Sequence, residues 1–224
     1  MQAAYQSLTE ISLVRAARTL ARRDSTLKSI FAEHGPPPLW ARKPDFATLV
    51  HIILEQQVSL ASAASIFARV KRNTVPFRPS RMIELGETHL KSLGLTRQKT
   101  AYCLDLSESL SGKRLRLSQL SRMDDEEART ALMQVKGIGR WSADVYLLMA
   151  LLRPDIWPAN DLALAIAVKN LKQLPVMPTQ LQLQTMAEAW RPFRSVAARM
   201  FWQSYLAQQK AARSLRSRAY QKTN

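Results

Sequence analysis

Leu132 to Leu164 read LMQVKGIGRWSADVYLLMALLRPDIWPANDLAL, and this stretch decides the fold that the sequence predicts. Its KGIG tetrapeptide, residues 136–139, separates two apolar runs, and two glycines around one apolar residue let the backbone turn without a Cβ clash. The following run, residues 142–152, contains one charged residue, Asp144, and ends before an Arg-Pro pair. The stretch therefore predicts a hairpin of two helices, the second of which is mostly core.

The glycine turn also predicts an anion site. Backbone amides at a helix N-terminus carry partial positive charge, and here those of Gly137 and Gly139 are expected to be exposed. Lys136 and Arg140 flank them. A nucleic-acid phosphate fits such a site, and the grip would be independent of base sequence, because backbone amides on phosphate position a duplex without reading its bases.

Asp161 follows the sequence WPAN, residues 157–160, and begins another apolar run. Asn160 and Asp161 are both residue types preferred as helix N-caps, so one interpretation is purely structural. A second interpretation is catalytic, because a carboxylate held ionised by a helix dipole can stabilise a positive charge that develops in a facing cleft. The spacing alone leaves both interpretations open.

The hairpin is one of four motifs that follow one another along the chain. They are IILEQQVS at residues 52–59, VKGIGRWSA at residues 135–143, Trp157-Pro158 followed by Asp161, and WRPFRS at residues 190–195 followed by Trp202. Together they resemble the helix-hairpin-helix (HhH-GPD) DNA glycosylase superfamily, and within it the AlkA-type 3-methyladenine DNA glycosylase II group. The motifs cover roughly residues 45 to 206, and four motifs in order are much harder to obtain by chance than one glycine hairpin.

The resemblance implies an all-α, two-lobed fold with a central cleft and a helix-hairpin-helix motif. One lobe is expected at approximately residues 45–160, with the hairpin at 132–152, and the other joins residues 1–44 to residues 161–206. The basic tail, residues 207–224, is either a frayed helix or an additional DNA-contacting arm. Few glycines and repeated apolar spacings of three and four agree with a helical chain.

Individual helices follow from the apolar spacing and the helix breakers. Residues 8–31 predict two helices that meet near Asp24, and residues 45–70 predict two helices joined by a short connection. Residues 81–93 predict one helix, and residues 115–120 predict a linker. The final helices are expected at residues 179–190 and 195–207. The acidic residues 124–127 suit a helix start, and no histidine accompanies them, so they predict capping and not a metal site.

By resemblance, the chain is a monofunctional DNA glycosylase of base excision repair. It would hydrolyse the N-glycosidic bond of alkylated purines, of the 3-methyladenine type, flipped out of duplex DNA. Asp161 would be catalytic, acting on the oxocarbenium-like sugar through its field or by orienting water. Trp141, Tyr146 and Trp202 would form the substrate pocket and attract a cationic base by cation–π forces. A single tryptophan such as Trp202 can equally be core.

Further residues are expected to contact DNA. The resemblance places the Gln57 side chain in the space left by an everted base, with Gln56 and Ser59 supporting its loop, although amides can also be surface filler. Arg97 and Lys99 are either phosphate contacts or ordinary charges at a helix start. The predicted DNA-contacting residues are Gln56, Gln57, Ser59, Arg97, Lys99, Lys136, Gly137, Gly139 and Arg140. The resemblance also allows a monovalent cation on hairpin carbonyls, and no other metal is expected.

Two details define the subclass. Bifunctional relatives carry a lysine nucleophile shortly after the hairpin, where this chain has Trp141, so no lyase activity is expected. Other relatives hold an iron–sulfur cluster on four cysteines, whereas this chain has only Cys103, so no such cofactor is expected. Two alternatives remain open: a non-catalytic lesion-binding protein on the same scaffold, and an oxidised-base glycosylase with lyase activity.

The charge balance favours a nucleic-acid partner. The 224 residues contain 33 Lys and Arg against 17 Asp and Glu, a formal net charge of +16, which attracts polyanions. No apolar run reaches the ~18 residues needed to span a bilayer, so no membrane association is expected. The single cysteine suits a reducing compartment. An intracellular monomer that acts on double-stranded DNA is therefore expected, in the cytoplasm or nucleoid of a bacterium or the nucleus of a eukaryote.

Overall fold

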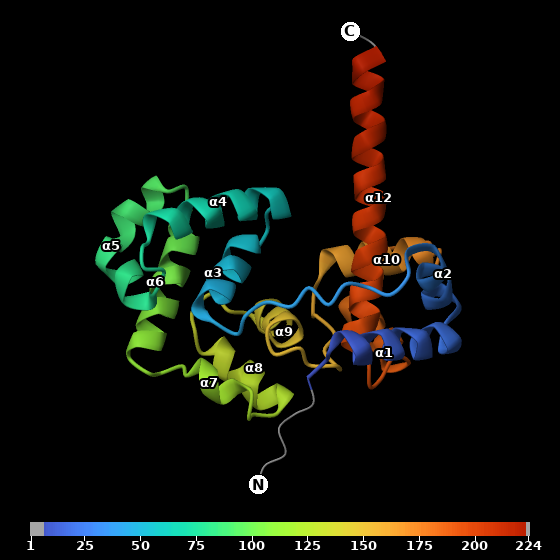
Figure 1. Ribbon diagram of the computed structural model, residues 1–224, viewed down its shortest axis with the longest axis horizontal. Coiled ribbons are helices and arrows are strands. Elements are labelled where there is room, and N and C mark those ends of the chain that lie inside the picture. Colours follow the sequence, from blue (N-terminus) through green and yellow to red (C-terminus); the bar gives the residue numbers. More distant parts are fainter. Residues whose placement is uncertain (1–6, 223–224) are drawn as a thin grey trace. The chain divides into compact units, whose positions relative to one another are not determined.

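The computed structural model describes residues 7–222, with the side chains described as far as residue 214 (Figure 1). Every helix or strand found in that range is an α-helix, which confirms the all-α prediction. The chain divides into two compact units. Among the described residues, unit 1 is Ala41–Arg153, and unit 2 combines Ser7–Trp40 with the residues from Pro154 onward.

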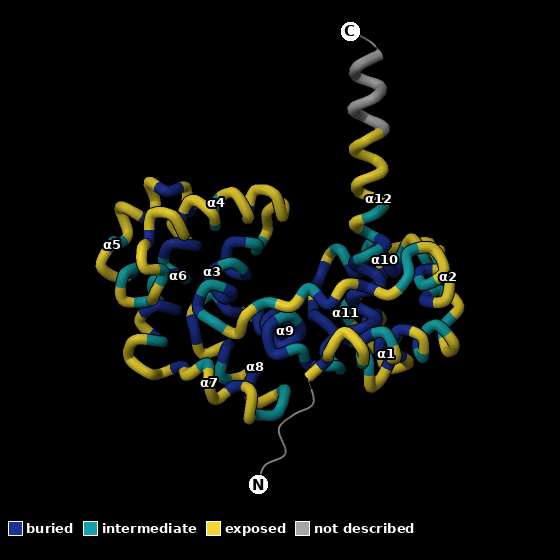
Figure 2. Tube along the Cα trace, in the orientation of Figure 1, coloured by how far each residue is buried: buried dark blue, intermediate teal, exposed yellow. Residues whose placement is uncertain are grey.

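Unit 1 contains the hairpin. Its helices are α3 (Phe46–Glu55), α4 (Leu60–Asn73), α5 (Pro79–Ser92), α6 (Arg97–Ser111), α7 (Leu117–Leu120), α8 (Asp125–Met133) and α9 (Arg140–Met149). The predicted linker at residues 115–120 was wrong, because it contains α7. Helix α3 packs against α4, α6 and α9, and α9 packs against α8. Figure 2 shows α9 as a largely buried element, as the apolar run after the hairpin predicted.

Side-chain caps begin most helices of unit 1. The hydroxyl or carboxylate oxygens of Asp45, Ser59, Thr96 and Asp124 each accept a hydrogen bond from a backbone N–H in the first turn of their helix. At Asp124, the Glu127 carboxylate also accepts from the Asp124 backbone N–H, which completes a capping box. The predicted capping role of the acidic residues 124–127 is confirmed.

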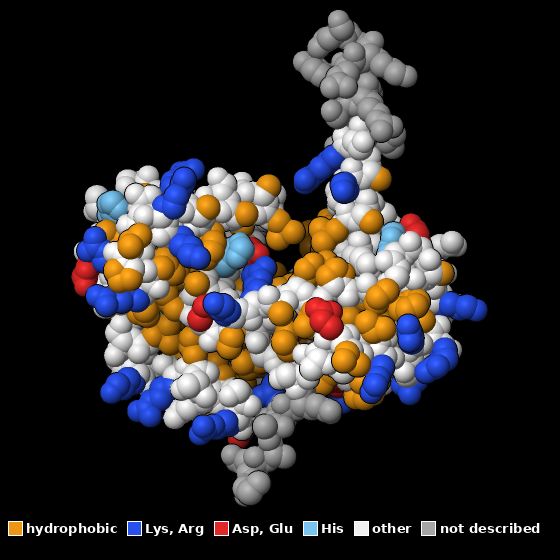
Figure 3. Space-filling view, viewed as in Figure 1, with side chains coloured by type: hydrophobic (Ala, Val, Ile, Leu, Met, Phe, Trp, Pro, Cys, Tyr) orange, Lys and Arg blue, Asp and Glu red, His pale blue; other side chains and the backbone are white. Residues whose placement is uncertain are grey.

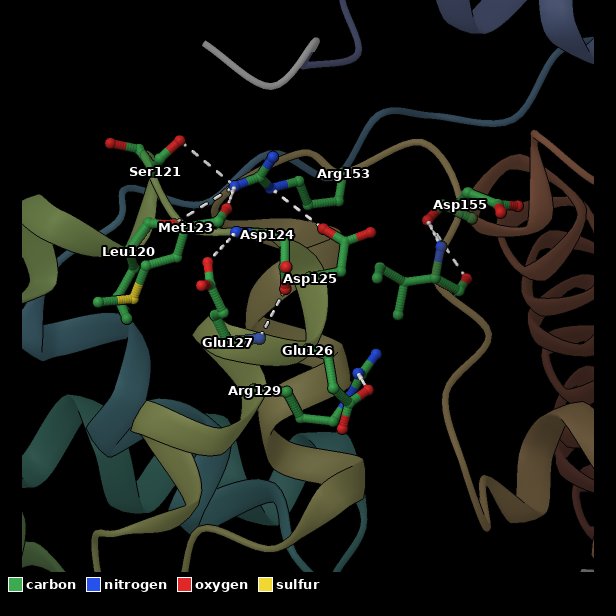
Figure 4. A network of polar contacts seen from close by, with 12 residues as sticks. Leu120, Ser121, Met123, Asp124, Asp125, Glu126, Glu127, Arg129, Arg153 and Asp155 are labelled. Atoms are coloured by element: carbon green, nitrogen blue, oxygen red, sulfur yellow. Dashed lines mark hydrogen bonds and ion pairs between the residues drawn. The ribbon is translucent and has the colours of Figure 1, made fainter. Parts of the chain in front are cut away.

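Two buried arginines hold the hairpin's first helix in place. The Arg129 Nε donates to the Asp144 carboxylate at 2.7 Å, which explains how α9 buries its one acid. Figure 4 shows the second arginine, Arg153, whose guanidinium lies at the start of α8. It donates to the carbonyl of Met123 at 2.7 Å and lies 3.4 Å from the Asp125 carboxylate.

Unit 2 is built from the two ends of the chain. Its helices are α1 (Glu10–Arg23), α2 (Ser25–His34), α10 (Leu162–Leu171), α11 (Gln180–Glu188) and α12 (Arg194–Lys222). The two N-terminal helices meet at Asp24, as predicted. No helix of the described chain is both long enough and apolar enough to cross a membrane.

Aromatic rings form the centre of unit 2. The rings of Trp157, Trp190 and Phe201 lie in mutual contact, with the centroids of Trp157 and Trp190 5.0 Å apart. Beside them, the fully buried Arg199 guanidinium donates to the carbonyls of Leu39 and Ser195. Trp157, shortly before Asp161 in the chain, is thereby packed into the core of unit 2.

Candidate active site and nucleic-acid interface

The hairpin turn uses its two glycines for different physical reasons. Gly137 has φ +86°, in the left-handed region that favours glycine, and a Cβ there would lie 2.1 Å from the Tyr102 ring. Gly139 has φ −87°, is exposed, and would meet nothing within 4 Å of an added Cβ. Gly137 is therefore required by packing, whereas Gly139 leaves open space beside the backbone.

The N-terminus of α9 has no side-chain cap. Gly139 is the N-cap residue, and a glycine supplies no oxygen to the first amides of the helix. Lys136 and Arg140 are both exposed beside it, and the Lys136 backbone N–H is held by Asp105 at 2.8 Å. This arrangement suits an anion that brings its own oxygens.

A second group of predicted residues lies in the loop between α3 and α4. Gln57 is exposed and has φ +56°, an uncommon conformation for a residue with a side chain. The Gln56 amide is turned inward, because its Nε2 donates to the Gly137 carbonyl at 2.8 Å and to the Ser142 hydroxyl at 2.9 Å. Ser59 caps α4 by accepting from the Ser62 N–H.

The two predicted phosphate contacts on α6 have different environments. Arg97 is exposed at the first position of the helix. Lys99 is buried, and its ammonium donates to the Leu54 carbonyl at 2.6 Å. Burial lowers the pKa of Lys99. The expectation that Lys99 contacts phosphate is corrected, because its ammonium is buried and donates to a carbonyl in the last turn of α3.

Asp161 is the N-cap of α10, so its structural interpretation is confirmed. Its Oδ1 accepts from the Leu164 N–H at 2.8 Å and from the Trp202 indole Nε1 at 3.2 Å, and its exposed fraction is 8%. The preceding residue, Asn160, has φ +58°, and its N–H donates to the Gln180 side-chain carbonyl at 2.8 Å. The carboxylate is thus held by fixed donors at the start of a helix.

The three predicted pocket aromatics are placed differently. Trp141 is partly exposed near the start of α9. Trp202 is buried, with its indole N–H on Asp161. Tyr146 is fully buried, its hydroxyl lacks a hydrogen-bond partner among the described residues, and burial raises its pKa. Because none of its ring is exposed, the expectation that Tyr146 offers a face to a base is corrected.

Sequence reasoning missed two supporting side chains. Gln180 lies 20 residues from the backbone amide that it holds, and Arg42 makes a two-fold hydrogen bond to Glu55, at 2.9 and 2.7 Å, next to the α3–α4 loop. Neither residue belongs to a local pattern, since both act on elements distant in the sequence. The one available signal was Glu55, a charged residue directly before the two glutamines, which would need a basic partner if it were buried.

Basic side chains are abundant on the exposed surface. Figure 3 shows Lys and Arg side chains at many points of the face that it draws. On α12, Lys210 and Arg213 are exposed. Such charge attracts a polyanion at long range. Within the described part of the chain, no three His, Cys, Asp or Glu side chains gather as a metal site would require. Cys103 is buried, and burial raises its pKa to about 12.

Comparison with known proteins gives the family. The model of the "HhH-GPD superfamily base excision DNA repair protein" family matches residues 50–194, a range that contains the α3–α4 loop, the hairpin and Asp161. The chain belongs to this superfamily.

Relatives of this HhH-GPD protein occur in bacteria and yeast. YfjP of Bacillus subtilis is 29% identical over 188 residues, which are 80% of this chain and 66% of that protein. DNA-3-methyladenine glycosylase 1 of Schizosaccharomyces pombe is 28% identical over 200 residues, covering 86% of this chain and 88% of that protein. The structure of the Schizosaccharomyces pombe 3-methyladenine DNA glycosylase Mag1 with abasic DNA superposes with a TM-score of 0.74, at 26% identity, over 84% of this chain and 95% of that one.

Proposed function

We propose that this HhH-GPD protein is a DNA glycosylase of base excision repair that releases alkylated purines, of the 3-methyladenine type, from double-stranded DNA. Membership of the superfamily supports the reaction class, and the Schizosaccharomyces pombe relative supports the substrate class. The observation that carries the proposal is the placement of Asp161, whose carboxylate is fixed by the Leu164 N–H and the Trp202 indole at the N-terminus of α10.

Asp161 would act on the sugar. When the N-glycosidic bond breaks, its electron pair leaves with the base and positive charge develops on the sugar, to which water then adds. A carboxylate that is already oriented stabilises that charge without reorganising at the moment of reaction. The Leu164 N–H and the Trp202 indole N–H both donate to Oδ1 of Asp161, and they hold this oxygen in place.

An aromatic face would favour alkylated bases. Alkylation places positive charge on the purine, and a cation is attracted to the face of an indole by about 0.5–2 kcal/mol. Trp141 is the partly exposed candidate for this contact. Recognition by charge and stacking would require few hydrogen bonds, and it would separate alkylated purines from normal ones.

The remaining predicted residues would hold the DNA. The uncapped amides at Gly139 would bind a phosphate, with Lys136, Arg140 and Arg97 adding long-range attraction. Gln57, presented on an exposed turn, would occupy the space of the everted nucleotide. These contacts position the duplex and do not read its sequence.

We further propose that the enzyme is monofunctional and acts as a monomer without an iron–sulfur cluster. Trp141 stands where bifunctional relatives carry a nucleophilic lysine, so water and not an amine would attack the sugar. Borohydride reduction of reactions on damaged DNA is then expected to trap no covalent adduct. A trapped adduct would favour the alternative of an oxidised-base glycosylase with lyase activity.

The central test is Asp161→Asn. Asparagine is an equally good N-cap, and its carbonyl can still accept from the Leu164 and Trp202 donors, so the fold and DNA binding should persist. Release of free bases from methylated DNA, resolved by chromatography, should fall by about 100-fold or more, as expected for removal of a charge that acts on the transition state.

The controls separate the alternatives. Undiminished base release by Asp161→Asn would remove this residue from the mechanism. If the wild-type protein binds methylated DNA but releases no base, the non-catalytic lesion-binding alternative is correct. Circular dichroism of both proteins establishes that the comparison is between folded chains.

A further inference from the structure

The α3–α4 loop and the hairpin turn are joined by one side chain. The Gln56 amide donates one hydrogen bond to the Gly137 carbonyl, 81 positions away, and one to the Ser142 hydroxyl, 86 positions away, at 2.8 and 2.9 Å. Gln56 directly follows α3, and Gly137 and Ser142 lie just before and in the first turn of α9. Figure 1 shows α3 and α9 side by side in unit 1. Both amide hydrogens of Gln56 are therefore used inside the protein.

The two groups that accept from this amide lie in a closely packed part of unit 1. Gly137 lies directly against the Tyr102 ring of α6, with no room between them for a Cβ. Ser142 is 2% exposed in the first turn of α9, and the Ile138 N–H is held by the Val135 carbonyl at 3.0 Å. The two hydrogen bonds of Gln56 therefore fix the position of the α3–α4 loop relative to the hairpin turn.

The residues before Gln57 are fixed from other sides as well. The Arg42 guanidinium binds both oxygens of Glu55, whose side chain is 7% exposed. The buried Lys99 ammonium binds the Leu54 carbonyl. With Gln56, three consecutive residues are anchored immediately before Gln57, which has φ +56° and is exposed.

We infer that Gln56 is a positioning residue that couples Gln57 to the phosphate-binding hairpin. This inference rests on the proposed function, because it assigns Gln57 to the space of the everted nucleotide and Gly139 to a phosphate. The hydrogen bonds of Gln56 set the distance between these two groups. The loop is already ordered in the free protein, so binding of DNA does not have to lose that conformational entropy. When the hairpin binds a phosphate, Gln57 is then aligned with the nucleotide to be everted.

The first variant is Gln56→Met, which keeps the length of the side chain and removes both donors. Single-turnover base release is compared for an alkylated purine in a normal pair and for the same purine opposite an abasic analogue, where no pairing must be broken. Because eversion from a pair depends most on Gln57, the ratio of the paired to the unpaired rate is expected to fall about tenfold.

Two controls separate positioning from general damage. Gln119→Met makes the same replacement at an exposed position of unit 1, and its ratio should equal that of the wild type. A loss of stability alone lowers the paired and the unpaired rates together, so an unchanged ratio for a folded Gln56→Met protein overturns the inference. Ser142→Ala, which removes one of the two acceptors, should reduce the ratio by a smaller factor, and this variant decides the question if Gln56→Met does not fold.

A second readout does not depend on catalysis. Binding to a duplex with an abasic analogue opposite 2-aminopurine reports, by fluorescence, how far the opposite base is unstacked. Gln56→Met should bind this duplex and give a smaller fluorescence change than the wild type. An equal change overturns the coupling, whereas failure of wild-type protein to release any alkylated base overturns the proposed function.

Discussion

At the scale of single residues, the two hairpin glycines have separate roles, which two substitutions can resolve. Gly137→Ala places a methyl group inside the Tyr102 ring and in a left-handed conformation, so the variant should lose about 1–3 kcal/mol of folding free energy. Gly139→Ala meets no neighbour and should cost less than about 1 kcal/mol, through the N-cap alone. Urea unfolding monitored by circular dichroism measures both.

The affinity for DNA should be affected in the opposite order: Gly139→Ala, the more stable variant, should lose more affinity than Gly137→Ala. A methyl group at Gly139 stands in the open space beside the α9 amides, where a phosphate would approach. Under conditions in which both proteins are folded, Gly139→Ala should therefore weaken binding to duplex DNA more than Gly137→Ala does. Equal affinity of Gly139→Ala and wild type would show that these amides do not hold phosphate.

Residue types predicted some positions and not others. Capping was one of two roles that the type and place of Asp161 allowed, and the structure confirms it, whereas the hydrogen bond of Asp161 to Trp202 joins residues 41 apart. Lys99 was expected at the surface because it begins a helix, but the last carbonyls of α3 lie within its reach. The apolar run after the hairpin predicted that α9 is mostly core, and Tyr146 is fully buried in it, so the pocket role that the resemblance implied for Tyr146 disagreed with the local pattern.

At the scale of elements, Asp24 joins four segments of unit 2. It ends α1, caps α2 through the Leu27 N–H, and accepts from the Trp190 indole at 3.0 Å and the Lys172 ammonium at 3.1 Å. Burial acts to raise its pKa, but these hydrogen bonds outweigh burial and hold the pKa below its ordinary value. The folded protein therefore favours the ionised form of Asp24 more than the unfolded chain does.

This predicts a pH-dependent stability. Asp24→Asn keeps the cap and loses the charge opposite Lys172, so it should be less stable than wild type by about 1–2 kcal/mol near neutral pH. Because the folded pKa is lowered, the advantage of the wild type is complete above the ordinary value of 3.8 and is lost as the pH falls through the folded pKa. Urea unfolding of both proteins from about pH 7 to about pH 3 measures the difference. A difference that does not change with pH would contradict the assignment.

Helix positions could be predicted more fully than their ends. The caps at Asp24 and Asp124 marked helix boundaries, because their side chains satisfy backbone groups locally. Helix α7 has no side-chain cap and only four residues, so the apolar pattern was too short to reveal it. The last helix continues to Lys222, since no proline or glycine follows Pro192 to end it. Residues 207–222 of the tail are therefore helical, residues 223–224 lie outside the described residues, and contact of the tail with DNA stays a prediction.

At the scale of the whole molecule, the net charge of +16 makes binding to DNA sensitive to salt. The logarithm of the binding constant should fall linearly with the logarithm of the salt concentration. If α12 contacts DNA, replacing the exposed Lys210 and Arg213 by glutamine removes up to two phosphate contacts and should reduce the slope by up to about 1.8. Fluorescence anisotropy over a salt series measures the slope, and an unchanged slope would exclude these two residues from the interface.

The route of the chain through unit 2 has a consequence for synthesis on the ribosome. Helices α1 and α2 are made before unit 1, yet some of their partners are made after it: Asp24 is bound by Lys172 and Trp190, and the Leu39 carbonyl by Arg199. Unit 1 is complete before Lys172, Trp190 or Arg199 has been translated. The nascent chain can therefore pack α1 against α2 early, but the contacts of both helices with α12 form only after α12 has been translated, so unit 2 is completed after unit 1.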